Sequence, residues 1–255
     1  MKRPLILVTN DDGITAPGIK ALVEVASSIG DVVIVAPDSP QSGQGHAITL
    51  KDPLRVKKAK IFKEFEAYEC SGTPVDCVKI ARDFILKDRK VDLCISGINH
   101  GSNASINIIY SGTMSAAMEA SLSGIDSIGF SLLDYAWEAD FEQAKPFIKD
   151  IITSTLENKL EATHLLNVNI PKLQREDIKG VRICRQAMGN WKEKYVEAED
   201  PRGGKYYWLT GHFENDDLDE STDMWALDNG YIAVVPSQHD LTAYKALDKL
   251  DWLKK

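Results

Sequence analysis

The fold of this chain is decided by the stretch Leu5-Ile6-Leu7-Val8-Thr9-Asn10-Asp11-Asp12-Gly13. Its first part is a short apolar run, which predicts a β-strand buried on both faces, as in a parallel sheet. Its second part predicts a tight turn, because Asn, Asp and Gly are the usual turn residues. Ligands of open α/β sheets bind beyond the carboxyl ends of the strands, so this turn is a candidate active site.

The turn carries two adjacent carboxylates. Neighbouring residues on a strand point to opposite faces, so Asp11 and Asp12 can reach one cation only if the chain turns there, which Gly13 permits. Oxygen ligands of this kind suit Mg²⁺ or Mn²⁺. The alternative is structural, because an Asp commonly caps the helix that follows and most turns of this kind bind nothing.

Strands and helices are expected to alternate after this turn. Strand-like runs lie at Leu5–Thr9, Asp31–Ala36, Val91–Ser96 and Ser127–Ser131, and segments with helical spacing at Ile19–Ser28, Val75–Leu86 and Met114–Ser123. The alternation predicts βαβ units and therefore an α/β fold with a parallel sheet flanked by helices.

The rest of the chain is expected to elaborate this core. We predict an exposed antiparallel ribbon outside the sheet at 50–69, a helix at 141–160, strands at 164–170 and 231–235, hairpins and loops at 181–211, an acidic loop at 214–223 and a terminal helix at 243–253. Since there is no internal repeat or low-complexity linker, we expect one domain over 1–255, with a core over about 1–180 and an extension over about 181–255.

Composition excludes some functions. The chain has 255 residues and a formal net charge of −8, which argues against binding to a nucleic acid duplex. No stretch is long and apolar enough for a signal peptide or a membrane span, so no membrane partner is expected. The four cysteines form no CxxC pair and are expected to be reduced thiols, so we expect a cytoplasmic protein.

Two further loops follow expected strands and carry small polar residues. The loop over 37–46 contains Ser42, which could supply another oxygen ligand, and its glycines allow close backbone approach. The loop over 97–103 offers the side-chain amides of Asn99 and Asn103. Turn chemistry alone would also explain either loop.

The segment Tyr110-Ser111-Gly112-Thr113 leads into a helix of small residues. A helix N-terminus attracts anions through its unpaired N–H groups and its dipole, so this segment could hold a phosphate. Capping by Ser111 is the alternative. An acidic metal loop and an anion site at the same sheet edge together predict phosphoryl chemistry, which neither predicts alone.

Five motifs carry a family resemblance, and they occur in the order Thr9-Asn10-Asp11-Asp12-Gly13, Ala36-Pro37-Asp38 with Gln41-Ser42-Gly43, Ser71-Gly72-Thr73-Pro74, Ser96-Gly97-Ile98-Asn99 and Tyr110-Ser111-Gly112-Thr113. The chain resembles the SurE survival-protein family of 5'-nucleotidases. The resemblance implies a Rossmann-like core, a divalent metal and hydrolysis of nucleoside 5'-monophosphates, with 3'-nucleotides and short polyphosphate as further substrates. It also implies a homodimer or homotetramer assembled through a C-terminal hairpin and helix extension.

The resemblance also assigns residues by motif. The metal ligands would be Asp11, Asp12, Ser42 and Asn99. The phosphate pocket would be Asn103, Ser111, Gly112 and Thr113. Asp11 and Asp12 would be catalytic, with Asp12 the candidate general base, although the sequence does not separate the two and a covalent aspartyl-phosphate stays open.

Two other interpretations stay open beside this one. A non-catalytic nucleotide-binding stress module would keep the anion site and need no metal. A haloacid-dehalogenase-like phosphatase is disfavoured, because its two aspartates are separated by one residue and these are adjacent. His46 and His239 are the only histidines expected near the site, and we expect each to shape a loop and take no part in acid catalysis.

Overall fold

The computed structural model describes residues 3–254 of the chain. Its strands are β1 (Leu5–Thr9), β2 (Asp31–Pro37), β3 (Val56–Lys58), β4 (Glu66–Cys70), β5 (Leu93–His100), β6 (Ser127–Leu132), β7 (Leu165–Ile170), β8 (Val181–Ile183), β9 (Asn190–Glu199), β10 (Lys205–Glu214) and β11 (Ile232–Ser237). Its α-helices are α1 (Pro17–Ser27), α2 (Pro74–Ile80), α3 (Gly112–Leu122), α4 (Lys145–Asn158) and α5 (Asp223–Asp228).

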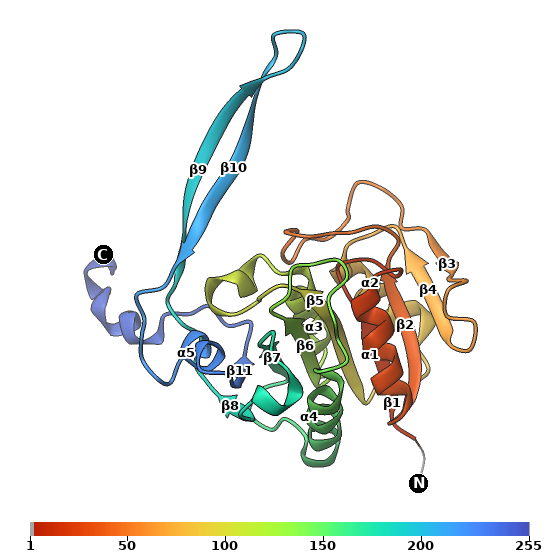
Figure 1. The fold of residues 1–255 in the computed structure, drawn as a ribbon. Coiled ribbons are helices and arrows are strands. Elements are labelled where there is room, and N and C mark those ends of the chain that lie inside the picture. The colour runs from red at the N-terminus through yellow and green to blue at the C-terminus, as the bar shows by residue number, and fades with distance from the viewer. Residues whose placement is uncertain (1–2, 255) are drawn as a thin grey trace.

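A nine-stranded sheet runs through the part that the structure describes, in the order β3-β4-β2-β1-β5-β6-β7-β11-β8 (Figure 1). The neighbours from β4 to β7 all pair in parallel. Helices cover both faces of this parallel region (Figure 1). The structure therefore confirms the predicted α/β fold with a mostly parallel, helix-flanked sheet.

The apolar run of β1 is buried on both faces of the sheet. Ile6 belongs to a core cluster that includes Leu22 of α1 and Ile148 of α4, whereas Leu7 belongs to a second cluster with Val78 of α2. All five residues of the strand are buried. A continuous apolar sequence is needed here because alternate side chains enter two separate cores.

Local sequence explains where α2 begins. The Thr73 hydroxyl accepts a hydrogen bond from the Asp76 N–H at 3.2 Å, and the Asp76 carboxylate accepts one from the Thr73 N–H at 2.9 Å. Pro74 occupies the first turn, where a missing N–H costs nothing. This capping box explains why the helix predicted from Val75 onward begins here.

The order of the strands reverses at β1. This strand lies between β2 and β5, with Leu5 paired with Asp31 on one side and Ile6 paired with Leu93 on the other. The connections leaving β1 and β5 therefore diverge to opposite faces of the sheet. Such a switch point opens a crevice at the carboxyl ends of the two strands, which is where α/β proteins bind ligands.

The predicted ribbon at 50–69 is wrong in one respect. β3 does pair antiparallel with β4, but β4 also pairs in parallel with β2, so the segment extends the sheet. Ala67 and Cys70 of β4 are buried against the sheet. The apolar residues of the segment therefore divide, because Phe62 and Ala67 are buried whereas Leu50, Val56 and Ile61 are exposed.

Two helix predictions also need correction. The helix predicted at 141–160 spans only Lys145–Asn158, and Pro146 lies in its first turn, where proline is favoured. The terminal helix predicted at 243–253 is wrong, because this segment forms two short 3₁₀ turns, Tyr244–Lys249 and Asp251–Leu253. None of their residues is buried, so no packed face stabilises a longer α-helix.

The last part of the chain has two components. Strands β8 and β11 join the main sheet, and β11 confirms the strand predicted at 231–235. Strands β9 and β10 form a ten-pair antiparallel hairpin that projects far from the sheet (Figure 1). Within residues 3–254, every helix is too short or too polar to cross a bilayer.

Candidate active site

A cavity of about 300 Å³ lies at the switch point, beyond the carboxyl ends of β1 and β5. Segments far apart in sequence contribute its lining, which consists of Asp11, Asp12, Ser42, Gly43, Asn99, His100, Ser102, Asn103, Asn107, Tyr110, Ser111, Tyr135 and Trp191. The lining includes all four residues predicted to bind a metal and two of the four predicted to bind phosphate. The cavity is the candidate active site.

Backbone hydrogen bonds hold the loops around this cavity together. The Gln41 N–H donates to the Asp11 carbonyl at 2.8 Å, which fixes the loop carrying Ser42 beside the acidic turn. The Gly45 N–H donates to the Tyr110 carbonyl at 3.2 Å and joins the same loop to the segment before α3. The rim is therefore a connected structure in which each loop positions the next.

Asp11 is held by the N-terminus of α3. Its carboxylate accepts a hydrogen bond at Oδ1 from the Thr113 hydroxyl, and the side chain is only 4% exposed. Gly112 permits this approach, because a Cβ at that position would lie 2.6 Å from the Asp11 Cβ. Burial, and then the charge of Asp12, raise the pKa of Asp11 to about 6, although the hydrogen bonds of Thr113 oppose the rise.

One carboxylate oxygen of Asp12 has no hydrogen-bond partner among the residues that the structure describes. Its Oδ2 is buried, and no residue within 3–254 donates a hydrogen bond to it. Burial raises the pKa of the Asp12 carboxyl, and interactions with the nearby His100 residue oppose this rise. A buried carboxylate oxygen without a donor is costly unless a cation or a proton satisfies it.

The neighbouring donors fit a divalent cation. The Asn99 amide nitrogen donates to the Gly101 carbonyl at 2.8 Å, which leaves the amide oxygen as the free end of the side chain. Ser42 contributes an exposed hydroxyl on the opposite loop. In the described part of the chain, no three side chains of His, Cys, Asp or Glu gather as a metal group. The donor set is two carboxylates with neutral oxygens, as Mg²⁺ and Mn²⁺ prefer.

The residues predicted to bind phosphate divide into two pairs. Asn103 and Ser111 line the cavity, whereas Gly112 and Thr113 are buried against Asp11. The Ser111 hydroxyl also caps α3, because it accepts a hydrogen bond from the Met114 N–H at 3.0 Å. Capping and ligand binding are compatible here, since the hydroxyl proton can still donate. Phosphate binding by these residues stays a prediction.

A buried polar network fixes Asn103. Its N–H donates to Oδ1 of Asn169, its carbonyl accepts from the Asn167 amide, and its own amide donates to the Ser131 hydroxyl, each at 2.8 Å. The Asn169 amide donates in turn to Asn167. The Asn-Val-Asn sequence of β7 therefore serves to orient the loop that follows β5.

Sequence reasoning missed His100. It lines the cavity, its Nδ1 lies 2.8 Å from the Ala136 carbonyl, and its ring stacks on Trp137 at 5.8 Å. The expectation that only His46 and His239 lie near the site is wrong, because both line a different cavity. The position of His100 directly after Asn99, at the end of β5, was the available signal.

Glu119 holds the loop that carries Ser42 through contacts with charged and polar side chains. Its buried carboxylate lies 2.7 Å from the Lys79 ammonium and 3.0 Å from Nε2 of His46. His46 belongs to the loop that carries Ser42, and Glu119 belongs to α3. The contact between His46 and Glu119 therefore connects the loop that carries Ser42 to the helix that holds Asp11, as a loop-shaping role for His46 predicts.

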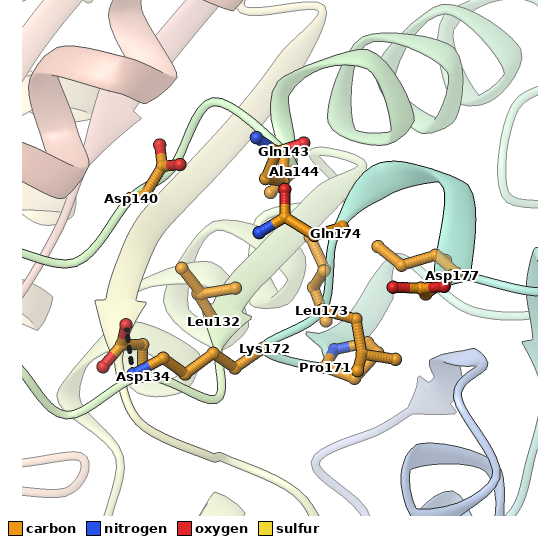
Figure 2. A pocket seen from close by; sticks show the side chains of 12 residues that line it. Leu132, Asp134, Asp140, Gln143, Ala144, Pro171, Lys172, Leu173, Gln174 and Asp177 are labelled. Atoms are coloured by element: carbon orange, nitrogen blue, oxygen red, sulfur yellow. Dashed lines mark ion pairs between the residues drawn. The ribbon is translucent and has the colours of Figure 1, made fainter.

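A second hollow, of about 340 Å³, lies beside the carboxyl ends of β6 and β7. Figure 2 shows an ion pair at one side of this hollow, in which the Lys172 ammonium lies 3.0 Å from the Asp134 carboxylate. None of the predicted metal or phosphate residues lines this hollow. It lacks the donor set of the switch-point cavity, so it is not the candidate active site.

Comparisons with known proteins agree with this geometry. A family model described as Survival protein SurE matches residues 6–193, which include every residue of the cavity. The chain is 59% identical over 254 residues to a protein of Flavobacterium johnsoniae named 5'-nucleotidase SurE, covering 99% of this chain and 98% of that protein. It is 47% identical over 250 residues to the protein of the same name from Bacteroides fragilis, covering 98% and 97%. A crystal structure described as SurE protein from Aquifex aeolicus matches with a TM-score of 0.85 at 40% identity, covering 99% of this chain and all of the other.

Proposed function

Because this chain belongs to the SurE family, we propose that it is a 5'-nucleotidase that hydrolyses nucleoside 5'-monophosphates to nucleoside and phosphate. The names of its relatives support this activity. The observation that carries the proposal is the convergence of Asp11, Asp12, Ser42 and Asn99 on one cavity beside the N-terminus of α3. That arrangement would combine a cation site with an anion site, as metal-dependent phosphoryl transfer uses.

We propose that one Mg²⁺ or Mn²⁺ ion per subunit binds Asp11, Asp12, Ser42 and Asn99. When bound, such an ion lowers the pKa of a water and neutralises charge on the phosphate. The unpartnered Oδ2 of Asp12 supports this ligand set. The Asn99 amide supports it too, because the hydrogen bond to Gly101 sets which end of the amide is free.

The protein's own groups would orient the reaction. Asn103 and Ser111 would donate hydrogen bonds to the phosphate, and the first turn of α3 would add its dipole. Asp12 is our candidate for the general base, accepting a proton from the attacking water. The reason is that Thr113 engages Oδ1 of Asp11 by a hydrogen bond, so Asp11 is the less available of the two carboxylates.

Two further properties belong to the proposal. Nucleoside 3'-monophosphates and short polyphosphate would be additional substrates, because the proposed contacts are to the phosphate. The protein would act as a homodimer or homotetramer in the cytoplasm. Support for assembly comes from the projecting hairpin, whose Tyr195, Tyr207 and Trp208 side chains are all exposed.

Phosphate release from a panel of 5'- and 3'-nucleoside monophosphates tests this function. The assay would be run with Mg²⁺, with Mn²⁺ and with a chelator. We expect hydrolysis that the chelator abolishes and that is fastest for 5'-monophosphates. Nucleotide binding without phosphate release under any condition would contradict the proposal and favour a non-catalytic nucleotide-binding module.

A further inference from the structure

Three aromatic side chains line the candidate active site, and the proposed metal and phosphate contacts use none of them. They are Tyr110, Tyr135 and Trp191, and they come from the segment before α3, the segment after β6 and the start of β9. Their exposed fractions are 50%, 75% and 39%. Their position on one polar cavity suits a ligand with an apolar face, because Tyr and Trp combine a large apolar surface with a polar end.

Trp191 is held in one orientation. Its indole N–H donates to the Asn107 amide oxygen at 2.8 Å, and its ring meets the edge of Phe213 at 5.8 Å. Gly189 leaves room for this packing, because a Cβ there would lie 2.3 Å from Cζ of Phe213. The ring therefore faces the cavity without needing a ligand to order it, which lowers the entropic cost of binding.

The chain that leads into Trp191 is also fixed. The Asp223 carboxylate, at the start of α5, accepts hydrogen bonds from the N–H groups of Ser105 at 2.8 Å and Ala187 at 2.9 Å. The Gly189 N–H donates to the Ser105 hydroxyl at 3.0 Å. The base of the hairpin is thus joined to the segment before α3, so Trp191 has a defined position relative to the phosphate-binding residues.

Tyr135 is accommodated closely as well. A Cβ at Gly101 would lie 2.3 Å from its Cε1 atom, and Gly101 adopts a φ of +100°, a region that other residues avoid. The Tyr135 hydroxyl lies 3.4 Å from the Ser102 N–H. A backbone without a side chain at 101 therefore lets this ring cover the loop beside Asn99.

We propose that Trp191, with Tyr135 as a second wall, binds the base of the nucleotide substrate by stacking. This inference rests on the proposed function and goes beyond it, because it assigns the residues that distinguish nucleotides from other phosphomonoesters. The phosphate would bind beside Asp11 and Asp12, and the aromatic side chains that line the same cavity would receive the planar base. Stacking tolerates any base, so the site selects for the presence of a base more than for its identity.

Trp191→Leu, assayed with 5'-AMP and with ribose 5-phosphate, tests the proposal. The second substrate carries the same phosphate and sugar without a base. We expect the KM for 5'-AMP to rise by about 5- to 150-fold, in line with the loss of one stacking contact, and kcat to change little. Hydrolysis of ribose 5-phosphate should stay within about twofold of wild type, and Trp191→Phe should recover most of the affinity for 5'-AMP.

Phe84→Leu is the control and should leave the KM for 5'-AMP unchanged. Phe84 is an exposed aromatic residue, at 74%, that neither lines the cavity nor lies on the hairpin. An unchanged KM for 5'-AMP in Trp191→Leu, or an equal loss with both substrates, would overturn the inference. If the wild-type protein hydrolysed neither substrate, the proposed function would fail, and calorimetric binding of 5'-AMP would then decide the inference separately. Binding equally tight in wild type and Trp191→Leu would overturn it.

Discussion

Asp11 lines the cavity, and the burial of its side chain has a measurable consequence for stability. The carboxyl is buried, and its pKa rises from the ordinary 3.8 to about 6. A folded protein with such a group binds a proton more tightly than the unfolded chain does. Between about pH 4 and pH 6 the metal-free protein therefore loses stability as the pH rises, and above that range the loss stays constant.

Asp11→Asn removes this penalty. A shift of that size corresponds to about 3 kcal/mol at most, so we expect the variant to gain about 1–3 kcal/mol in free energy of unfolding at pH 7 in the presence of a chelator. Near pH 4 the two proteins should be equally stable. Urea denaturation at a series of pH values measures this. The interpretation would be contradicted if the difference in unfolding free energy between Asp11→Asn and wild type were no larger at pH 7 than at pH 4.

Gly112 tests how closely Asp11 must approach α3. In Gly112→Ala the new Cβ would meet the Asp11 side chain, whose Cβ would be only 2.6 Å away, so the carboxylate must move. We expect kcat/KM for nucleotides to fall by about 100-fold, because small displacements of reacting groups are costly. Leu122→Ala, at the exposed end of the same helix, is the control and should keep normal turnover. Normal turnover in Gly112→Ala would refute the argument.

For individual residues, the sequence predicted which oxygen donors lie together at the cavity. Asp11, Asp12 and Ser42 follow strands of one parallel sheet, Asn99 lies at the carboxyl end of another strand of it, and these positions share an edge. Trp191 could not be placed in the same way, because its position depends on a hairpin remote in sequence.

Helix α3 is the element that joins the two halves of the site. Its N-terminus holds Asp11 through Thr113, and Glu119 in its third turn holds the Ser42 loop through His46. Lys79 of α2 completes this cluster. The loops that carry the proposed metal ligands thus depend on contacts made by a helix whose own side chains mostly lie outside the cavity.

Glu119→Gln should loosen that connection. It removes the charge that pairs with Lys79 and His46, and both partners are partly exposed, so we expect a loss of about 1–2 kcal/mol in free energy of unfolding. The affinity for Mn²⁺ should fall several-fold, because the loop bearing Ser42 becomes less ordered. Isothermal titration calorimetry measures the affinity. Glu157→Gln, an exposed position on α4, is the control, and an equal effect of both substitutions would contradict this role.

Elements were predictable where their pattern is local. The runs that became β1, β2, β5 and β6 each contain a short, largely apolar stretch, and that pattern indicates buried parallel strands. The attachment of β4 to β2 was not predictable, because its sequence alternates as an exposed ribbon would. The terminal segment has helical spacing, but spacing produces an α-helix only where a packed face supports it.

The whole molecule has an unusual outline, because the hairpin of β9 and β10 extends away from the sheet (Figure 1). Nearly all of its side chains are exposed, including Tyr206, Tyr207 and Leu209. An isolated two-stranded hairpin is marginally stable in water. Contacts with other subunits would explain both its length and its aromatic surface, as the proposed assembly requires.

Trimming the hairpin tests this. Lys194 pairs with Thr210, so residues 195–209 can be replaced by Asn-Gly, the preferred two-residue turn. The base of the hairpin with Trp191 is retained. We expect an unchanged circular dichroism spectrum in the helical region and a smaller particle in sedimentation velocity. A trimmed protein with the same number of subunits as wild type would contradict a role of the hairpin in assembly.

The central claim is that Asp11, Asp12, Ser42 and Asn99 form a cation site on which nucleotide hydrolysis depends. The most direct test measures Mn²⁺ binding and 5'-AMP hydrolysis on the same preparations of wild type and Asp12→Asn. We predict one Mn²⁺ per chain in the wild type, with turnover that follows its occupancy, and the loss of both in the variant. An Asp12→Asn protein that binds no Mn²⁺ yet hydrolyses 5'-AMP at the wild-type rate, or one that retains both properties, would contradict the account.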